Sequence, residues 1–249
     1  MSERLVELLD PQPGQVILEL AAGTGDTGFA ALPRLRPGGQ LITTDVAPEM
    51  VDAARRRAAE LGLEGASFAV QDAAVLRLAD GSVDGVLCRW GLMLVPDMDA
   101  AAREIARVAR PRGRVAVAVW ADPAANEWMT APGRAGVELG LMERPDPEAP
   151  GPFRLSPEGR LAEVMEAAGL DVIETEEVPL TWRAPTLAEW WDVVGDMSPS
   201  LGALLERLGA DDRTSLREAA ERLLERYVTP DGALAVPGLA RVGLAVRPG

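Results

Sequence analysis

The sequence lacks histidine and lysine: arginine supplies all 25 of its cationic side chains. Without these residues the protein cannot use a histidine base, a histidine metal ligand or a lysine Schiff base. Many hydrolases, metalloenzymes and aldolases are therefore excluded, and we expect no metal site.

Cysteine is almost absent as well. Cys88 is the only one, so an internal disulfide or a thiolate metal cluster cannot form, which fits a reducing compartment. The strongest apolar run, Val115 to Trp120, is far shorter than the ~20 residues of a membrane helix. The first residues, Met1 to Asp10, also lack a secretory signal pattern. We therefore predict a cytoplasmic protein without membrane insertion.

Cations are scarce relative to anions. The 25 arginines face 39 acidic residues, which gives a formal net charge of −14 and a pI near 4.5. Such a chain repels a phosphate backbone, because nucleic-acid affinity depends largely on cationic side chains. We expect a small-molecule partner and no nucleic acid.

Short apolar runs alternate with helix-length segments in the first half of the chain. The runs are Gln15–Leu20, Leu41–Thr44, Phe68–Val70, Val83–Cys88 and Arg114–Trp120. This alternation is typical of a parallel α/β sheet. We expect one helix from Pro48 to about Leu61, and another that is capped by Asp97 and ends before Pro111.

The second half is less regular. Its segment from Ala121 to Pro157 is rich in proline and glycine, so we expect an irregular inserted loop or cover element there. The elements expected after it are a helix at Pro157–Ala168, a strand at Val172–Val178, a helical region at Thr186–Tyr227 divided near Ser198–Pro199, and a final strand at Leu239–Val246.

A glycine-rich turn follows the first predicted strand. The strand residues Ile17–Leu20 lead into Gly23, Gly25 and Gly28 and then into a helix. Glycines allow a ligand to approach the backbone closely at the end of a strand, where open α/β sheets bind ligands. The same glycine spacing also fits a dinucleotide-binding turn, and a purely structural turn is a further alternative.

An acidic residue lies in or directly after each of the first three predicted strands. Glu19 lies within the first strand, Asp45 ends the second, and Asp72 follows the third. Asp45 stands where a carboxylate accepts hydrogen bonds from a ribose. Asp72 stands where a carboxylate accepts from an adenine amino group. Together with the glycine turn, the three acids indicate a nucleoside site.

Residues from about Leu5 to Trp120 resemble the class I S-adenosylmethionine-dependent methyltransferases, particularly the bacterial ubiquinone and menaquinone biosynthesis C-methyltransferases. The resemblance rests on Glu19, Ala21, Gly23 and Gly25, which occupy the positions of the family's acid and glycine motif. It implies a Rossmann-like α/β fold with helices on both faces of a seven-stranded, mostly parallel sheet. The implied strand order is 3-2-1-4-5-7-6, with the last strand antiparallel and a helical insertion before it.

The resemblance implies S-adenosylmethionine as cofactor and S-adenosylhomocysteine as product. The implied cofactor-binding residues are Glu19, Ala21, Gly23, Gly25, Asp45, Met50, Asp72, Ala73 and Arg89. At the methionine end, Glu19 would hold the amino group directly or through water. Gly23 and Gly25 would line the methionine, and Arg89 would approach it through its backbone.

The remaining implied contacts concern the nucleoside. Asp45 resembles the ribose-binding acid, and Met50 resembles the apolar residue that packs on the adenine. Asp72 and the backbone of Ala73 match the motif that binds the adenine edge.

Three departures from the family pattern stand out. Ala21 replaces the first glycine of the motif, Arg112 replaces another usual glycine, and the family's helices before the first strand are almost entirely absent. The missing helices predict a more open site, a covering element from another subunit, or reduced activity. A homo-oligomer is therefore among the expected assemblies.

The positions of several tryptophans indicate where the methyl acceptor could bind. Trp90, Met93 and Trp120 follow the fourth and fifth strands, and Trp128 lies in the expected insertion, so these four residues could line an apolar substrate pocket. Core packing is the alternative. We identify no catalytic base. Because the sulfonium donor is already activated, the protein would act mainly by positioning donor and acceptor.

The sequence thus predicts transfer of a methyl group from S-adenosylmethionine to a small apolar or aromatic acceptor. The alternatives are an NAD-dependent oxidoreductase and a noncatalytic nucleoside-binding or assembly protein of the same fold. We expect one domain at 1–249, with a cofactor-binding half at 1–120. The acceptor-side half at 121–249 would carry insertions at 121–157 and 182–236.

Overall fold

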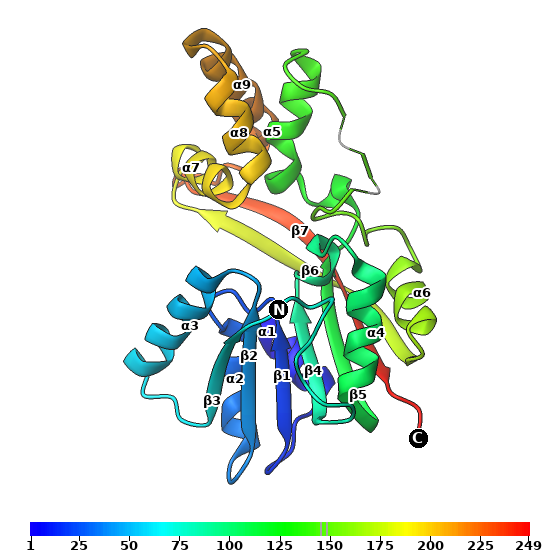
Figure 1. The fold of residues 1–249 in the computed structure, drawn as a ribbon. Coiled ribbons are helices and arrows are strands. Elements are labelled where there is room, and N and C mark those ends of the chain that lie inside the picture. Colours follow the sequence, from blue (N-terminus) through cyan, green and yellow to red (C-terminus); the bar gives the residue numbers. More distant parts are fainter. Residues whose placement is uncertain (145, 148) are drawn as a thin grey trace. The chain divides into compact units, whose positions relative to one another are not determined.

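The computed structural model describes residues 1–144, 146–147 and 149–249. The strands in this part of the chain are β1 (Val16–Leu20), β2 (Gln40–Asp45), β3 (Ala66–Val70), β4 (Val83–Arg89), β5 (Ala109–Trp120), β6 (Asp171–Ala184) and β7 (Leu234–Val246). Across these described residues they form one seven-stranded sheet in the order β3-β2-β1-β4-β5-β7-β6 (Figure 1). Neighbouring strands from β3 to β5 run parallel.

The strand β7 runs antiparallel to β5. The Arg112 amide donates a hydrogen bond to the Arg247 carbonyl at 2.8 Å, whereas nine positions later the Ala121 amide bonds to the Leu239 carbonyl at 3.1 Å. As residue numbers rise in one strand, they fall in the other. The predicted strand order and antiparallel last strand are therefore confirmed.

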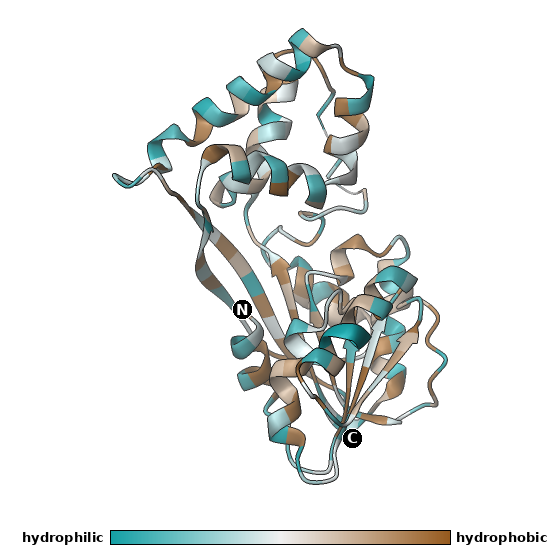
Figure 2. Ribbon diagram, turned by 90° about the vertical axis from the view of Figure 1, so that its left-hand side faces the viewer, coloured by the Kyte–Doolittle hydropathy of each residue, from teal (hydrophilic) through white to brown (hydrophobic). Residues whose placement is uncertain are grey.

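Helices cover both faces of the sheet (Figure 1). The helices in the described part of the chain are α1 (Ser2–Leu9), α2 (Asp26–Leu35), α3 (Pro48–Glu60), α4 (Met98–Val108), α5 (Glu127–Glu138), α6 (Arg160–Ala167), α7 (Leu187–Met197), α8 (Pro199–Arg207) and α9 (Ala210–Leu224), of which α5, α7, α8 and α9 do not belong to these covering layers. The helix α1 packs against α2, β4 and β5, whereas α4 packs against β5 and α6. Figure 2 shows the helices striped with hydrophobic and hydrophilic residues, as expected for helices with one buried side.

The chain divides into two compact units. Unit 1 comprises Met1–Trp120, Glu148–Val178 and Arg241–Gly249, and unit 2 comprises Ala121–Pro147 and Pro179–Ala240. Both β6 and β7 contribute residues to each unit. None of the described helices is long and apolar enough to cross a membrane. The single-domain organisation remains a prediction.

The predicted irregular insertion at 121–157 contains a helix, α5, although positions 145 and 148 lie outside the described residues. Trp128 therefore lies on the first turn of a helix rather than in a loop. The buried residues of α5 form one stripe at helical spacing: Trp128, Ala131, Pro132, Ala135 and Gly136. Burial of this stripe overrides the low helix propensity of proline and glycine.

Proline within α5 leaves one carbonyl without its usual partner. In a regular helix the residue at position 132 would donate to the carbonyl of Trp128, but proline has no N–H. The indole Nε1 of Trp190 instead donates to that carbonyl at 2.8 Å. A side chain of α7 thus replaces the missing backbone donor and stabilises the helix that the sequence pattern did not predict.

The structure also corrects element lengths. The helix α1 was not predicted, and β6 and β7 extend beyond the predicted limits of Val178 and Leu239. Pro179 and Pro237 lie in these extensions, although proline cannot donate to a sheet ladder. Each strand has an open side there, because β6 is an edge strand and Pro237 lies beyond the point where β5 ends.

Candidate functional site

The glycine turn connects β1 to α2 through left-handed backbone positions. Ala21 has a φ of 49°, Gly23 of 55° and Gly25 of 85°. Glycine adopts such values without strain, whereas alanine does not. A Cβ at Gly23 would meet nothing within 4 Å, but one at Gly25 would run into the Phe29 ring. The turn thus has open space beside Gly23, where a ligand can approach the backbone.

The Asp45 carboxylate ties the turn to the end of β2. Its Oδ2 accepts a hydrogen bond from the Gly23 amide at 2.8 Å, and its Oδ1 accepts from the Ala47 amide at 3.0 Å. The Gln71 amide after β3 bonds to the Asp45 carbonyl at 3.0 Å. Because an ionised carboxylate has about four lone-pair positions, Asp45 can still accept bonds from a ligand.

Apolar and acidic side chains surround this point. Val46 and Met50 are 67% and 44% exposed, so both apolar side chains are open to solvent. Asp72 lies in the turn after β3, where its Oδ1 accepts from the Ala74 amide at 2.8 Å, next to Ala73. Of the predicted nucleoside residues, Asp45, Asp72 and Ala73 therefore lie at or just after the ends of two adjacent strands, and Met50 lies in the first turn of α3.

The end of β4 lies on the other side of β1. Arg89 donates from Nε to the Thr27 hydroxyl at 2.9 Å and pairs with Asp26 at 3.2 Å. Its guanidinium carbon lies 4.6 Å from the centre of the Trp90 ring, and that ring stacks on Trp120 with centroids 4.2 Å apart. Arginine and two indoles thus form a continuous stack at the ends of β4 and β5.

The other two predicted pocket residues are placed differently. Met93 is 1% exposed and lies in a short 3-10 helix, Leu92–Leu94, so it belongs to the core of unit 1. Trp128 belongs to unit 2 and stacks on Trp182 with centroids 5.1 Å apart. The structure therefore brings Trp90 and Trp120 together, while the pocket as a whole remains a prediction.

Sequence reasoning missed Arg57. From α3 it donates to the Thr24 carbonyl at 3.1 Å and also pairs with Asp26, at the first residue of α2. Asp26 therefore has two arginine partners, Arg57 and Arg89. No motif indicates Arg57, because an arginine on the helix α3 looks like an ordinary solvated residue.

Ala21 fits this turn because Gly91 faces it. A Cβ at Gly91 would overlap the Ala21 methyl group and would lie 3.2 Å from the Cys88 sulfur. The departure from glycine at position 21 therefore depends on glycine at position 91.

Replacing Gly91 with alanine should lower the free energy of unfolding by about 1–3 kcal/mol, because the new methyl overpacks the turn. In Gly91→Ala with Ala21→Gly, most of this loss should be recovered. Urea unfolding of the single and double variants measures the effect. Gly133→Ala is the control, since a Cβ at Gly133 meets nothing within 4 Å. Ala21→Gly alone relieves strain at a φ of 49°, so its single variant is measured too, and strictly additive effects of the two substitutions would contradict the contact.

Glu19 is buried beneath the turn. Its Oε1 accepts a hydrogen bond from the Gly28 amide at 2.7 Å, and the side chain as a whole is only 2% exposed. Burial raises the pKa of Glu19 to about 7, although the Gly28 bond and the charge of Arg89 act against this shift.

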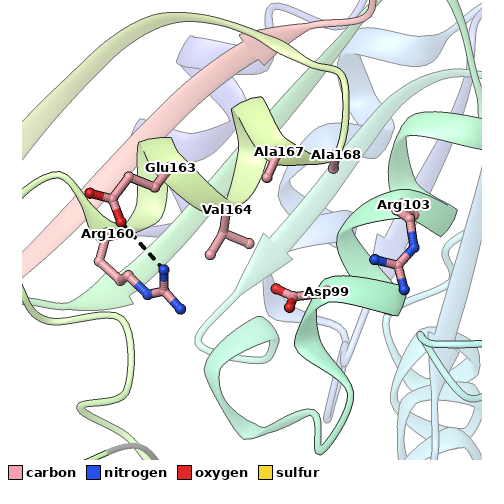
Figure 3. A pocket seen from close by; sticks show the side chains of 7 residues that line it. All are labelled: Asp99, Arg103, Arg160, Glu163, Val164, Ala167 and Ala168. Carbon is pink, nitrogen blue, oxygen red and sulfur yellow. Dashed lines mark hydrogen bonds and ion pairs between the residues drawn. The ribbon is translucent and has the colours of Figure 1, made fainter.

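No group of three or more potential metal ligands occurs among the described residues. A groove of about 210 Å³ lies between α4 and α6 (Figure 3). It is lined by Asp99, Arg103, Arg160, Glu163, Val164, Ala167 and Ala168. None of these residues belongs to the glycine turn or to the strand ends described above, so the groove has no part in this site.

The fold and the glycine turn together define an α/β protein whose predicted nucleoside-binding acids, Asp45 and Asp72, lie at adjacent strand ends. A family model described as a methyltransferase domain matches residues 11–133. Nocamycin O-methyltransferase of Saccharothrix syringae is 32% identical over 198 residues, which cover 75% of this chain and 70% of that protein.

Other relatives match a shorter region. A ubiquinone/menaquinone biosynthesis C-methyltransferase of Acidiphilium cryptum is 40% identical over 110 residues, covering 44% of this chain and 43% of the relative. This chain thus spans less than half the length of that relative. The solved structure of the YcgJ protein from Bacillus subtilis covers 100% of this chain, with 98% of its own chain matched, a TM-score of 0.64 and 20% identity.

The chain belongs to the class I S-adenosylmethionine-dependent methyltransferases. It is a methyltransferase, and S-adenosylmethionine is its cofactor. The predicted family, fold and cofactor are therefore confirmed, and the alternative of an NAD-dependent oxidoreductase is set aside.

Proposed function

We propose that the protein transfers the methyl group of S-adenosylmethionine to an oxygen atom of a small apolar or aromatic molecule. The observation that carries the choice of oxygen is the extent of the matches. Nocamycin O-methyltransferase matches 75% of the chain, more than the 120 residues before Ala121 can supply. The C-methyltransferase of Acidiphilium matches only 44%, a length that the cofactor half alone could provide. Resemblance in the acceptor-side half therefore favours an oxygen acceptor.

The proposed cofactor site follows the predicted residues. The open space beside Gly23 suits the methionine portion, and the free lone pairs of Asp45 suit the ribose hydroxyls. The exposed Met50 suits one face of the adenine, while Asp72 and Ala73 suit its edge. When bound, the cofactor supplies an activated methyl group on a positive sulfur.

The protein's own contribution would be orientation and exclusion of water. The stack of Arg89, Trp90 and Trp120 gives the strand ends a rigid aromatic wall, and we assign the acceptor to that side. Met93 would support the wall from the core of unit 1, while an acceptor role of Trp128 stays a prediction. The base that deprotonates a hydroxyl acceptor remains unassigned. The cytoplasm stays our predicted location, and a homo-oligomer stays a predicted assembly.

Mass spectrometry with S-adenosylmethionine carrying a ¹³C methyl group tests this function. A panel of phenols, enols and carboxylic acids should include acceptors that gain one labelled methyl, and NMR should show that methyl on oxygen. The panel also contains matched compounds whose hydroxyl is replaced by hydrogen, which should not react. Labelled methyl on carbon would contradict the choice of oxygen. Cofactor binding without transfer to any compound would instead favour a noncatalytic protein.

A further inference from the structure

The helix α2 begins without a capping side chain at its own N-cap position. That position is Gly25, and no N-cap side-chain bond is present among the described residues. The first amides of a helix need acceptors, and a serine or aspartate at the N-cap normally bonds to the second or third. Here the third amide, that of Gly28, donates to Oε1 of Glu19 on β1. Glu19 thus acts as the cap from the neighbouring strand.

The residues packed around Glu19 hold its backbone and side chain in place. The Thr44 hydroxyl donates to the Glu19 carbonyl at 2.8 Å, which fixes β1 against β2. A Cβ at Gly28 would overlap the carboxylate Oε2, so only glycine lets the helix approach so closely. Oε2 and the hydroxyl of Thr43, its register neighbour on β2, are both buried and have no hydrogen-bond partner among the described residues.

The charged and titratable groups that act electrostatically on or with Glu19 are Asp26 on α2 and Arg89 and Cys88 on β4. Burial dominates and raises the pKa of Glu19 to about 7, so both protonation states are populated at neutral pH. Burial also raises the pKa of Cys88 to about 11, which removes it from this range. No histidine is present to titrate beside Glu19.

We propose that Glu19 is a positioning residue whose ionised carboxylate holds α2 and the glycine turn in the cofactor-binding conformation, so that cofactor affinity rises when Glu19 loses its proton. An ionised carboxylate accepts a stronger hydrogen bond from Gly28 than a protonated one, and it also interacts favourably with the positive end of the helix dipole. The proposal rests on placement of the cofactor at this turn. It differs from the prediction that Glu19 holds the methionine amino group.

Calorimetry with S-adenosylhomocysteine tests the proposal. Between about pH 6 and about pH 8, the affinity should rise roughly tenfold, because that range spans the loss of one proton. Glu19→Gln should bind with an affinity that changes little over this range, since an amide cannot ionise. The pH dependence that remains in that variant comes from groups other than Glu19 and is subtracted. Glu163→Gln, which removes an exposed carboxylate of α6, should retain the native pH dependence.

A second ligand separates the two roles of Glu19. 5′-Methylthioadenosine has the adenine and ribose but no amino acid portion. If Glu19 acts through the turn, the affinity for this ligand should rise with pH as well. A rise for S-adenosylhomocysteine alone would show that Glu19 acts on the amino group and would overturn the proposal.

NMR of the unliganded protein provides a measurement that needs no variant. The Gly28 amide signal should titrate with a midpoint near pH 7, because this amide donates directly to the Glu19 carboxylate. A flat Gly28 titration, or an equal pH dependence of binding in Glu19→Gln, would overturn the role of Glu19. Binding of neither ligand at any pH would instead overturn the cofactor site itself.

Discussion

Replacing Trp128 by alanine is expected to lower the free energy of unfolding of unit 2 by about 3–5 kcal/mol. The side chain is 2% exposed and stacks on Trp182 at 5.1 Å, so alanine would leave a large cavity. The loss would also disturb the stretch of α5 whose carbonyl bonds to Trp190. Hydrogen exchange should therefore accelerate in α5 and α7, while S-adenosylhomocysteine affinity changes little because the proposed cofactor residues belong to unit 1.

Two variants make this result interpretable. Trp182 is only partly buried, so Trp182→Ala should cost less than Trp128→Ala although it removes the other half of the same stack. Trp128→Phe should restore most of the stability and, if Trp128 contacts the acceptor, change acceptor preference in a folded protein. Equal hydrogen exchange in native and Trp128→Ala proteins would show that the ring is not needed for packing.

Asp45→Ala is expected to weaken S-adenosylhomocysteine binding by about ten- to a hundredfold, since a hydrogen bond to a charged group contributes about 1.5–3 kcal/mol. The variant loses the proposed ribose acceptor and the bonds from Gly23 and Ala47. Calorimetry measures the loss. Asp52→Ala, which removes an exposed carboxylate on α3, should bind like the native protein.

A ligand with an altered ribose can distinguish two roles of Asp45: direct contact with the ribose, and support of the glycine turn. 2′-Deoxy-S-adenosylhomocysteine should bind the native protein more weakly than the parent ligand. In Asp45→Ala the two ligands should bind alike, because the partner of the 2′-hydroxyl is gone. If Asp45→Ala and removal of the 2′-hydroxyl from the ligand weaken binding additively, Asp45 only supports the glycine turn.

The sequence predicts the sheet well because each core strand is a short apolar run, and because the strand ends carry glycine or acid. It does not predict α5, because Pro132 and Gly136 resemble loop residues until Trp190 and α9 are seen to pack around that helix. The lengths of β6 and β7 also depend on context, since a proline is tolerated where a strand has an open side.

Within the candidate site, local motifs indicate the glycine turn and Asp45 but not their supports. Arg57 reaches the turn from α3, and Gly91 accommodates the Ala21 methyl from the end of β4. These contacts join residues far apart in the chain, so no single motif contains them. The cap supplied by Glu19 is likewise visible only when β1 and α2 are seen together.

The discontinuity of unit 2 limits how this unit can be exchanged between related enzymes. Its two segments, Ala121–Pro147 and Pro179–Ala240, are separated in the chain, yet α5 from the first packs against α9 from the second. A chimaera that exchanges one segment would therefore pair helices from different parents along a shared core. Both segments should therefore be exchanged together, with junctions inside β6 and β7, so that the exchanged unit keeps the packing of α5 against α9.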